Sequence, residues 1–197
     1  MGRKSLRETR RKEIVKAFYI VAKREGFEKT SIAKVAEYME INPSLVIHYF
    51  KSKQGLEVAL IDYILERYLQ IYKANGDINT AEKLLDLIDK LFSRKWNRLF
   101  DDGVFYSCYA HVYRNKEFKN KFKQLHDSLR SILKQSFIDA GYNEVIQFDN
   151  IDKLTETIFA LLEGAYYYLG LVDDKKEYDE KVEYYKQHVI EVLQIRR

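Results

Sequence analysis

The residues best suited to chemistry lie in a short segment between positions 42 and 53. Ser44 and His48 lie about one helical turn apart and carry hydrogen-bonding side chains, and Lys53 adds a positive charge. A serine hydroxyl can donate or accept a hydrogen bond at a base edge, whereas the neighbouring Leu45 offers only apolar contact, for instance to a thymine methyl group. These side chains could therefore contact a nucleic acid, provided that the elements around them form a helix that fits a groove.

Motifs for catalysis or cofactor binding are absent from the sequence. It has no repeated Glu-x-x-His pair, glycine-rich phosphate loop, nucleophile elbow or zinc motif. Cys108 and His111 would supply only two metal ligands, and His126 and His188 have no sequence link to them. The single cysteine excludes an internal disulfide, and nothing in the sequence would activate its thiol as a redox switch. We therefore expect no enzymatic activity, no metal and no cofactor.

Positive charge is concentrated at the start of the chain. Residues 1–56 carry 13 Lys and Arg against 6 Asp and Glu, whereas the remainder carries 21 against 24. A basic head suggests a polyanion as its partner, and a solvated basic face is the alternative. The longest weakly charged stretch, Ile158–Val172, is too short at about 15 residues to span a bilayer. With a charged N-terminus that shows no signal peptide, we expect a cytoplasmic protein without a membrane partner.

The elements that position these residues are predicted to be helices. One proline and eight glycines in 197 residues leave few helix breakers, which favours an all-α fold. Thr30 and Asn42 fit the N-caps of two short helices, Pro43 fits the first position of the second, and Ser52 fits the cap of a long helix. We expect about nine helices, at approximately residues 7–24, 32–39, 43–49, 53–72, 81–99, 103–115, 117–140, 149–171 and 176–195.

Two short helices joined by a tight turn and flanked by basic residues describe a helix-turn-helix. The segment from residue 30 to residue 56 resembles the TetR family of regulators in Thr30-Ser31, Val35-Ala36 and the aromatic ending Tyr49-Phe50-Lys51-Ser52-Lys53. Glu40 replaces the usual turn glycine, and Ile47 replaces a frequent tyrosine. The stretch from Ile47 to Leu56 is similar to the branch that contains the choline-responsive betaine-pathway repressor.

The resemblance implies a recognition helix that lies in the major groove of double-stranded operator DNA. Ser44 and Leu45 would contact base edges, and His48 would contact a base or a phosphate, while Val46 and Phe50 would face the core. The alternative is that Tyr49 and His48 only pack against neighbouring residues. Further DNA contacts to the phosphate backbone, and to a minor groove for the N-terminal arm, are predicted for Arg3, Lys4, Arg7, Thr30, Ser31, Tyr49 and Lys53.

The remainder of the chain is expected to bind an effector and to dimerise, which divides the protein into residues 1–52 and 53–197. The predicted pocket for a small apolar or cationic effector is lined by Trp96, Phe100, Tyr106, Tyr109, Tyr113, Phe159, Glu163, Tyr166 and Tyr167. The predicted homodimer interface contains Gly164, Ala165, Tyr185, Val189 and Val192. The alternatives are aromatic residues that form core, a Glu163 on the helix surface, and last helices that pack within one chain.

Together these features predict a ligand-responsive transcriptional repressor that binds a pseudo-palindromic operator as a homodimer. The alternative is a helical carrier of small molecules that does not bind DNA, which would explain the aromatic body but not the basic head.

Overall fold

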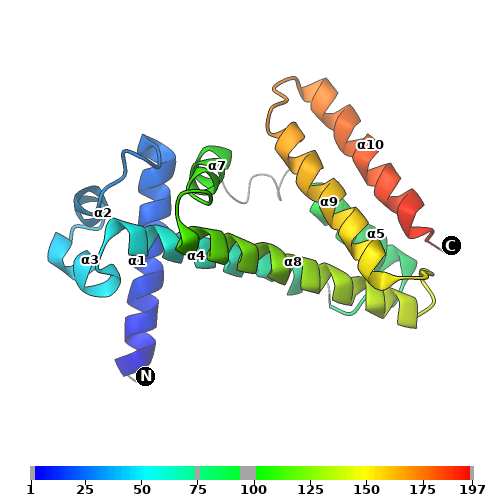
Figure 1. Cartoon of the computed structure of the whole chain (residues 1–197), viewed down its shortest axis with the longest axis horizontal. Coiled ribbons are helices and arrows are strands. Elements are labelled where there is room, and N and C mark those ends of the chain that lie inside the picture. The colour runs from blue at the N-terminus through cyan, green and yellow to red at the C-terminus, as the bar shows by residue number, and fades with distance from the viewer. Residues whose placement is uncertain (1–2, 74–75, 94–100, 196–197) are drawn as a thin grey trace. The chain divides into compact units, whose positions relative to one another are not determined.

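The computed structural model describes the backbone of residues 3–73, 76–93 and 101–195, and the side chains of residues 6–69, 76–93 and 101–195. It confirms the expected all-α class, because these residues form nine helices and no strand (Figure 1). The helices are α1 (Arg3–Glu25), α2 (Ile32–Tyr38), α3 (Pro43–Phe50), α4 (Lys53–Lys73), α5 (Ala81–Leu91), α7 (Asp102–Ala110), α8 (Lys116–Tyr142), α9 (Ile151–Leu169) and α10 (Lys175–Leu193).

Capping residues set most of the helix ends. Gly26 ends α1 with a φ of 93°, a conformation that glycine adopts without strain. The Ser52 hydroxyl accepts a hydrogen bond from the Gly55 amide at 3.1 Å, which confirms Ser52 as the cap of α4. The helix predicted at 81–99 ends early, since α5 closes at Leu91, and residues 94–99 of that prediction lie outside the described residues.

The end of α8 differs from the predicted end at residue 140, because the helix continues to Tyr142. Gly141 lies within the last turn, and the residue with a left-handed backbone is Glu144, at a φ of 57°. A Cβ atom on Gly141 would lie 2.6 Å from Cε1 of Phe148. The absence of a side chain at position 141 therefore permits close packing of an aromatic ring rather than a helix stop.

Backbone contacts divide the chain into two compact units. The first unit comprises Met1–Arg67 and Phe100–Leu125, and the second comprises Tyr68–Leu99 and His126–Arg197. The division falls inside α4 and α8, so each of these helices begins in the first unit and ends in the second.

The first unit is built around α1. Phe18 is fully buried and packs edge-on against Phe27, with ring centroids 5.9 Å apart. The first parts of α4 and α8 run side by side in the same direction (Figure 1), joined by a Lys121–Asp62 ion pair at 2.8 Å. Other buried residues of this core are Ile14, Val21, Val35, Ala36, Val46, Leu56, Leu60, Val104, Cys108, Phe118 and Phe122.

In the second unit α9 and α10 form a hairpin (Figure 1), and α5 packs against α10. Lys186 of α10 forms an ion pair with Asp89 of α5 at 2.7 Å, and the hydrogen bond to this carboxylate raises the pKa of Lys186. The core contains Leu84, Leu87, Ile88, Leu133, Phe137, Ile158, Leu162 and Leu193. No helix in the described parts of the chain is long and apolar enough to cross a membrane.

Candidate nucleic-acid interface

The segment predicted as a helix-turn-helix folds into two short helices, α2 and α3, joined by a tight turn. The N-cap of α2 is Ser31, whose hydroxyl accepts a hydrogen bond from the Lys34 amide at 3.3 Å, so the prediction of Thr30 as the cap is wrong by one residue. Thr30 is instead 1% exposed, and its hydroxyl donates to the Gly26 carbonyl at 2.9 Å. The predicted phosphate contact of Thr30 stays a prediction, which the structure does not support because this hydroxyl is buried and already bonded to Gly26.

The turn between α2 and α3 contains Glu40 in place of a glycine. Its φ is 54°, so a side chain occupies the left-handed region that glycine adopts without a steric penalty. The Ile41 amide donates to the Ala36 carbonyl at 2.9 Å and closes the turn behind Glu40. The departure from the family pattern thus leaves the turn intact but strained.

Replacing Glu40 with glycine is expected to stabilise the chain by about 0.5–1 kcal/mol, because it removes the left-handed penalty. Urea denaturation followed by circular dichroism measures the change. Glu37→Gly is the matched control, since Glu37 is an exposed residue inside α2, where glycine costs about 1 kcal/mol. Equal destabilisation by both substitutions would contradict the strain at Glu40.

The N-terminus of α3 is capped as predicted. Asn42 accepts a hydrogen bond from the Ser44 amide at 2.9 Å, and Pro43 is the first helical residue. Val46 is fully buried and Phe50 is 5% exposed, which confirms the predicted inner face of this helix.

At the other end of α3, Arg11 of α1 lies 4.4 Å above the Phe50 ring and donates to the Tyr49 carbonyl. The helix is therefore fixed at both ends, with its outer face open.

The predicted base readers differ in exposure. Ser44 and His48 are exposed, and Leu45 is half-buried. The His48 ring packs edge-on against Tyr49, with centroids 5.4 Å apart, and Tyr49 is itself half-buried. The structure thus brings Ser44, Leu45 and His48 together on one short helix.

The basic residues predicted to contact phosphates lie on α1 and α4, and they differ in how far their side chains are held by the protein. Lys53 Nζ donates to the Glu28 carbonyl at 3.1 Å and lies 3.4 Å from the Glu57 carboxylate, so its charge is fixed at the start of α4. Arg3 and Lys4 lie in the first turn of α1 rather than in an extended arm, and their side chains lie outside the described residues. Arg7 is exposed on the same helix.

The residues at the two ends of α7 contact α1 and the loop that follows it, and no local feature of the sequence indicates these contacts. His111 Nε2 lies 3.0 Å from the Glu28 carboxylate, and its ring packs beside Phe27 and Phe118. The Asp101 amide donates to the Tyr19 hydroxyl at 2.9 Å, and burial raises the pKa of this phenol. Both links join residues more than 80 positions apart, so no helical periodicity predicts them.

The predicted effector-binding residues are divided between the two units. Tyr106, Tyr109 and Tyr113 of the first unit form part of an aromatic group with Phe105 and Phe122. Phe159, Glu163, Tyr166 and Tyr167 belong to α9 in the second unit, and Trp96 and Phe100 lie outside the described residues. The common pocket therefore stays a prediction.

Two groups predicted to bind a cation already have cationic or histidine partners within the chain. Glu163 lies 3.2 Å from His126 Nε2, and the Arg130 guanidinium lies 4.6 Å above the Phe159 ring. Arg130 is also paired with Glu156 at 2.9 Å. A cationic effector at this position would have to compete with side chains of α8.

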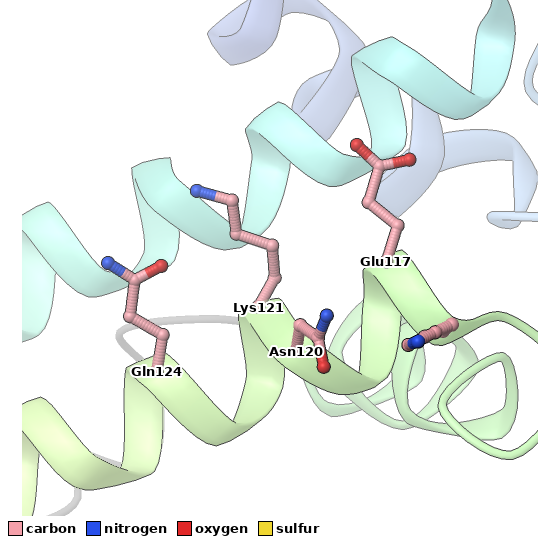
Figure 2. Close-up of a pocket in the computed structure, with 5 residues that line it drawn as sticks. Glu117, Asn120, Lys121 and Gln124 are labelled. Carbon is pink, nitrogen blue, oxygen red and sulfur yellow. The ribbon is translucent and has the colours of Figure 1, made fainter.

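Two surface hollows lie elsewhere. The described lining of one is a polar row on α8, and Figure 2 shows Glu117, Lys121 and Gln124 projecting from this helix toward α4. The residues that line it are Lys116, Glu117, Asn120, Lys121 and Gln124. The second hollow is lined by Asp77, Asn79, Ile138, Asp139, Tyr142 and Asn143. Among the described lining residues of these two hollows, none is an aromatic residue predicted to bind the effector.

The predicted dimer residues lie on α9 and α10 with different exposures. Ala165 and Val189 are buried inside their own chain, at 3% and 2% exposure, whereas Tyr185 and Val192 are half-buried. Gly164 is exposed, and a Cβ atom placed on it would meet nothing within 4 Å. Among these five, Gly164 is the residue that presents open space on the outer face of α9.

Cys108 is fully buried in the first unit. Burial is the main cause that raises the pKa of its thiol, and the nearby carboxylates of Glu57 and Glu28 add to this rise. A thiol with a raised pKa is a poor nucleophile and a poor metal ligand. Within the described residues no three His, Cys, Asp or Glu side chains are grouped to hold a metal ion.

Two family models match the chain. Residues 14–60 match the model described as bacterial regulatory proteins of the tetR family, and residues 79–195 match the model described as the tetracyclin repressor-like C-terminal domain. The first match contains the helix-turn-helix, and the second contains α5 and α7 to α10.

Individual relatives are similar over shorter or more divergent stretches. The HTH-type transcriptional regulator BetI of Paraburkholderia phymatum is 34% identical over 65 residues, so the chain spans only 33% of that relative's length. A TetR transcription regulator from Haloarcula marismortui has the same fold, with a TM-score of 0.81, 20% identity and coverage of 94% of this chain and 97% of that one. A regulator from Saccharomonospora viridis, crystallised with choline, has a TM-score of 0.74 at 15% identity, with coverage of 96% and 100%.

Proposed function

Because the chain belongs to the TetR family of bacterial transcriptional regulators, we propose that it is a ligand-responsive repressor that binds a pseudo-palindromic operator as a homodimer. The observation that carries this proposal is the geometry of α3. The helix has a capped N-terminus, a buried inner face formed by Val46 and Phe50, and an outer face on which Ser44 and His48 are exposed. A short helix held in this way can enter a major groove without rearrangement.

The two proposed functions are assigned to two consecutive regions of the chain. Residues 1–52 read DNA, and residues 53–197 bind the effector and dimerise. α4 and α8 both begin in the compact unit that contains the helix-turn-helix and end in the unit that contains α9 and α10, so each helix links these two units along the chain. Effector binding is proposed to tilt α4 in each subunit of the dimer. The tilt would change the distance between the two helix-turn-helix motifs and so weaken operator binding. As an operator-binding protein, the chain is proposed to act in the cytoplasm.

Gel retardation with a fragment from upstream of the chain's own gene tests operator binding. With about six phosphate contacts per dimer, affinity is expected to fall roughly 1,000-fold between 50 and 200 mM salt. Lys53→Ala should weaken binding about equally on all sequences, and Ser44→Ala should alter sequence preference. An unrelated fragment of equal length is the control. If neither fragment shows a salt-sensitive, sequence-selective shift, the alternative of a small-molecule carrier that does not bind DNA is favoured.

The effector is proposed to be a small apolar or cationic molecule. The aromatic residues of α7 and α9 support this class, and so does the fold shared with the Saccharomonospora viridis regulator whose structure holds choline. Repeating the retardation with millimolar choline chloride should weaken the shift, and the same concentration of sodium chloride controls for ionic strength. An identical effect of both salts would remove choline from the proposed effectors.

A further inference from the structure

The outer face of α3 contains an apolar residue among polar and cationic ones. The exposed residues of this helix are Pro43, Ser44, Ile47 and His48, and the exposed Lys51 follows directly after its end. Ile47 is 48% exposed, whereas the other large apolar residues of α3, Leu45, Val46 and Phe50, are half-buried or buried. Ile47 therefore differs from the polar and cationic residues around it because its side chain is apolar. It differs from the other large apolar residues of α3 because it is exposed.

Packing does not account for an isoleucine at this position. Val46 and Phe50 supply the contacts of α3 with the core, and both are nearly or completely buried. Isoleucine is also a weaker helix former than alanine, leucine or lysine, because its branched Cβ restricts rotation against the preceding turn. Single exposed apolar residues are common on protein surfaces, so the position of Ile47 within the face, rather than its exposure, is informative.

Ile47 occupies the middle of this outer face. On a helix, residues three and four apart are neighbours, so Ile47 lies next to Ser44 on one side and next to Lys51 on the other. His48 is the next residue in the chain, and its ring packs edge-on against the Tyr49 ring. When such a face lies in a groove, its central residues approach the base edges, and its marginal residues approach the sugar-phosphate backbone.

The floor of the major groove presents one apolar group, the C5 methyl of thymine, among hydrogen-bond donors and acceptors. We propose that Ile47 is a specificity-determining residue that contacts a thymine methyl in each half-site of the operator. This inference rests on the proposed operator binding and adds a base reader to Ser44, Leu45 and His48. It requires no hydrogen bond, because the isoleucine side chain has only apolar atoms.

The test compares thymine with uracil, which pairs identically with adenine but lacks the methyl group. The preferred duplex is first selected from a random-sequence pool with the wild-type chain. Each symmetric pair of thymines in that duplex is then replaced by uracil, and binding is measured for the wild type, Ile47→Ala and Leu45→Ala. Ile47 is exposed, so circular dichroism should show the same fold for Ile47→Ala.

At one symmetric pair of thymines, the wild type should lose about fourfold in affinity per half-site on loss of the methyl group. Ile47→Ala should bind the thymine and uracil duplexes equally at that pair, and Leu45→Ala should retain the difference. If Ile47→Ala shows the same uracil profile as the wild type at every position, the proposed contact is wrong. If the wild type enriches no sequence from the pool, operator binding itself fails, which is a separate outcome.

Discussion

Replacing Gly55 with alanine is expected to destabilise the chain by about 1–3 kcal/mol and to reduce operator affinity at least about tenfold. Gly55 lies in the first turn of α4, and a Cβ atom there would overlap the backbone carbonyl oxygen of Phe50, the last residue of α3. The Phe50 carbonyl also accepts the Ser52 amide at 2.7 Å, and the Phe50 ring is buried beneath Arg11. Relief of the overlap therefore requires the whole end of α3 to move against α4.

The matched control for this substitution is Gln54→Ala, one residue earlier in the same turn. Gln54 is exposed and donates a side-chain hydrogen bond to Glu117 at 3.3 Å, so its loss should cost less than about 0.5 kcal/mol. Urea denaturation and retardation of the selected duplex measure both variants. Wild-type stability and affinity in Gly55→Ala would show that the junction between α3 and α4 adapts, and that α3 is not held as the structure indicates.

The features that the sequence predicted well are those set by neighbouring residues. Asn42 and Pro43 were identified from the preferences of helix N-termini, and the structure places both in those roles. Glu40 was identified because the family pattern has glycine there, and its φ of 54° explains that preference. The shift of the α2 cap from Thr30 to Ser31 has a local cause too, since both residue types cap helices and only the register distinguishes them.

The features that the sequence did not predict depend on contacts between distant segments. The pairing of His111 with Glu28 arises because α7 packs against α1 within the first unit, which no spacing in the sequence indicates. Glu163 likewise pairs with a residue that is distant in the sequence. The sequence left a cation site and a position on the helix surface open for this carboxylate, and the structure places it exposed on α9, 3.2 Å from His126 of α8. Apolar periodicity shows which face of a helix is buried but not which helix covers it.

Replacing Gly164 with lysine is expected to prevent dimerisation while leaving the monomer folded. On α9 the exposed Gly164 and Tyr167 lie one helical turn apart, and Leu171, 65% exposed, follows two residues after the helix ends. This apolar stripe around a residue without a side chain fits close approach of a second α9 across a two-fold axis. Inside the chain nothing lies within 4 Å of the added Cβ, so lysine should stabilise the helix by about 0.5–1 kcal/mol.

In the proposed dimer the lysine side chains of the two subunits would lie close together across the two-fold axis. Each would place a bulky positive charge in an apolar interface. Loss of a central contact of this kind costs at least about 2 kcal/mol, or roughly a thirtyfold weaker dimer. Sedimentation equilibrium measures the association, and retardation measures the accompanying loss of operator affinity. Ser131→Lys is the matched control, because it adds the same side chain at an exposed position of α8. A variant Gly164→Lys that is folded and still dimeric would place the interface on another face, since a steric block at the centre of a two-fold contact acts on both subunits at once.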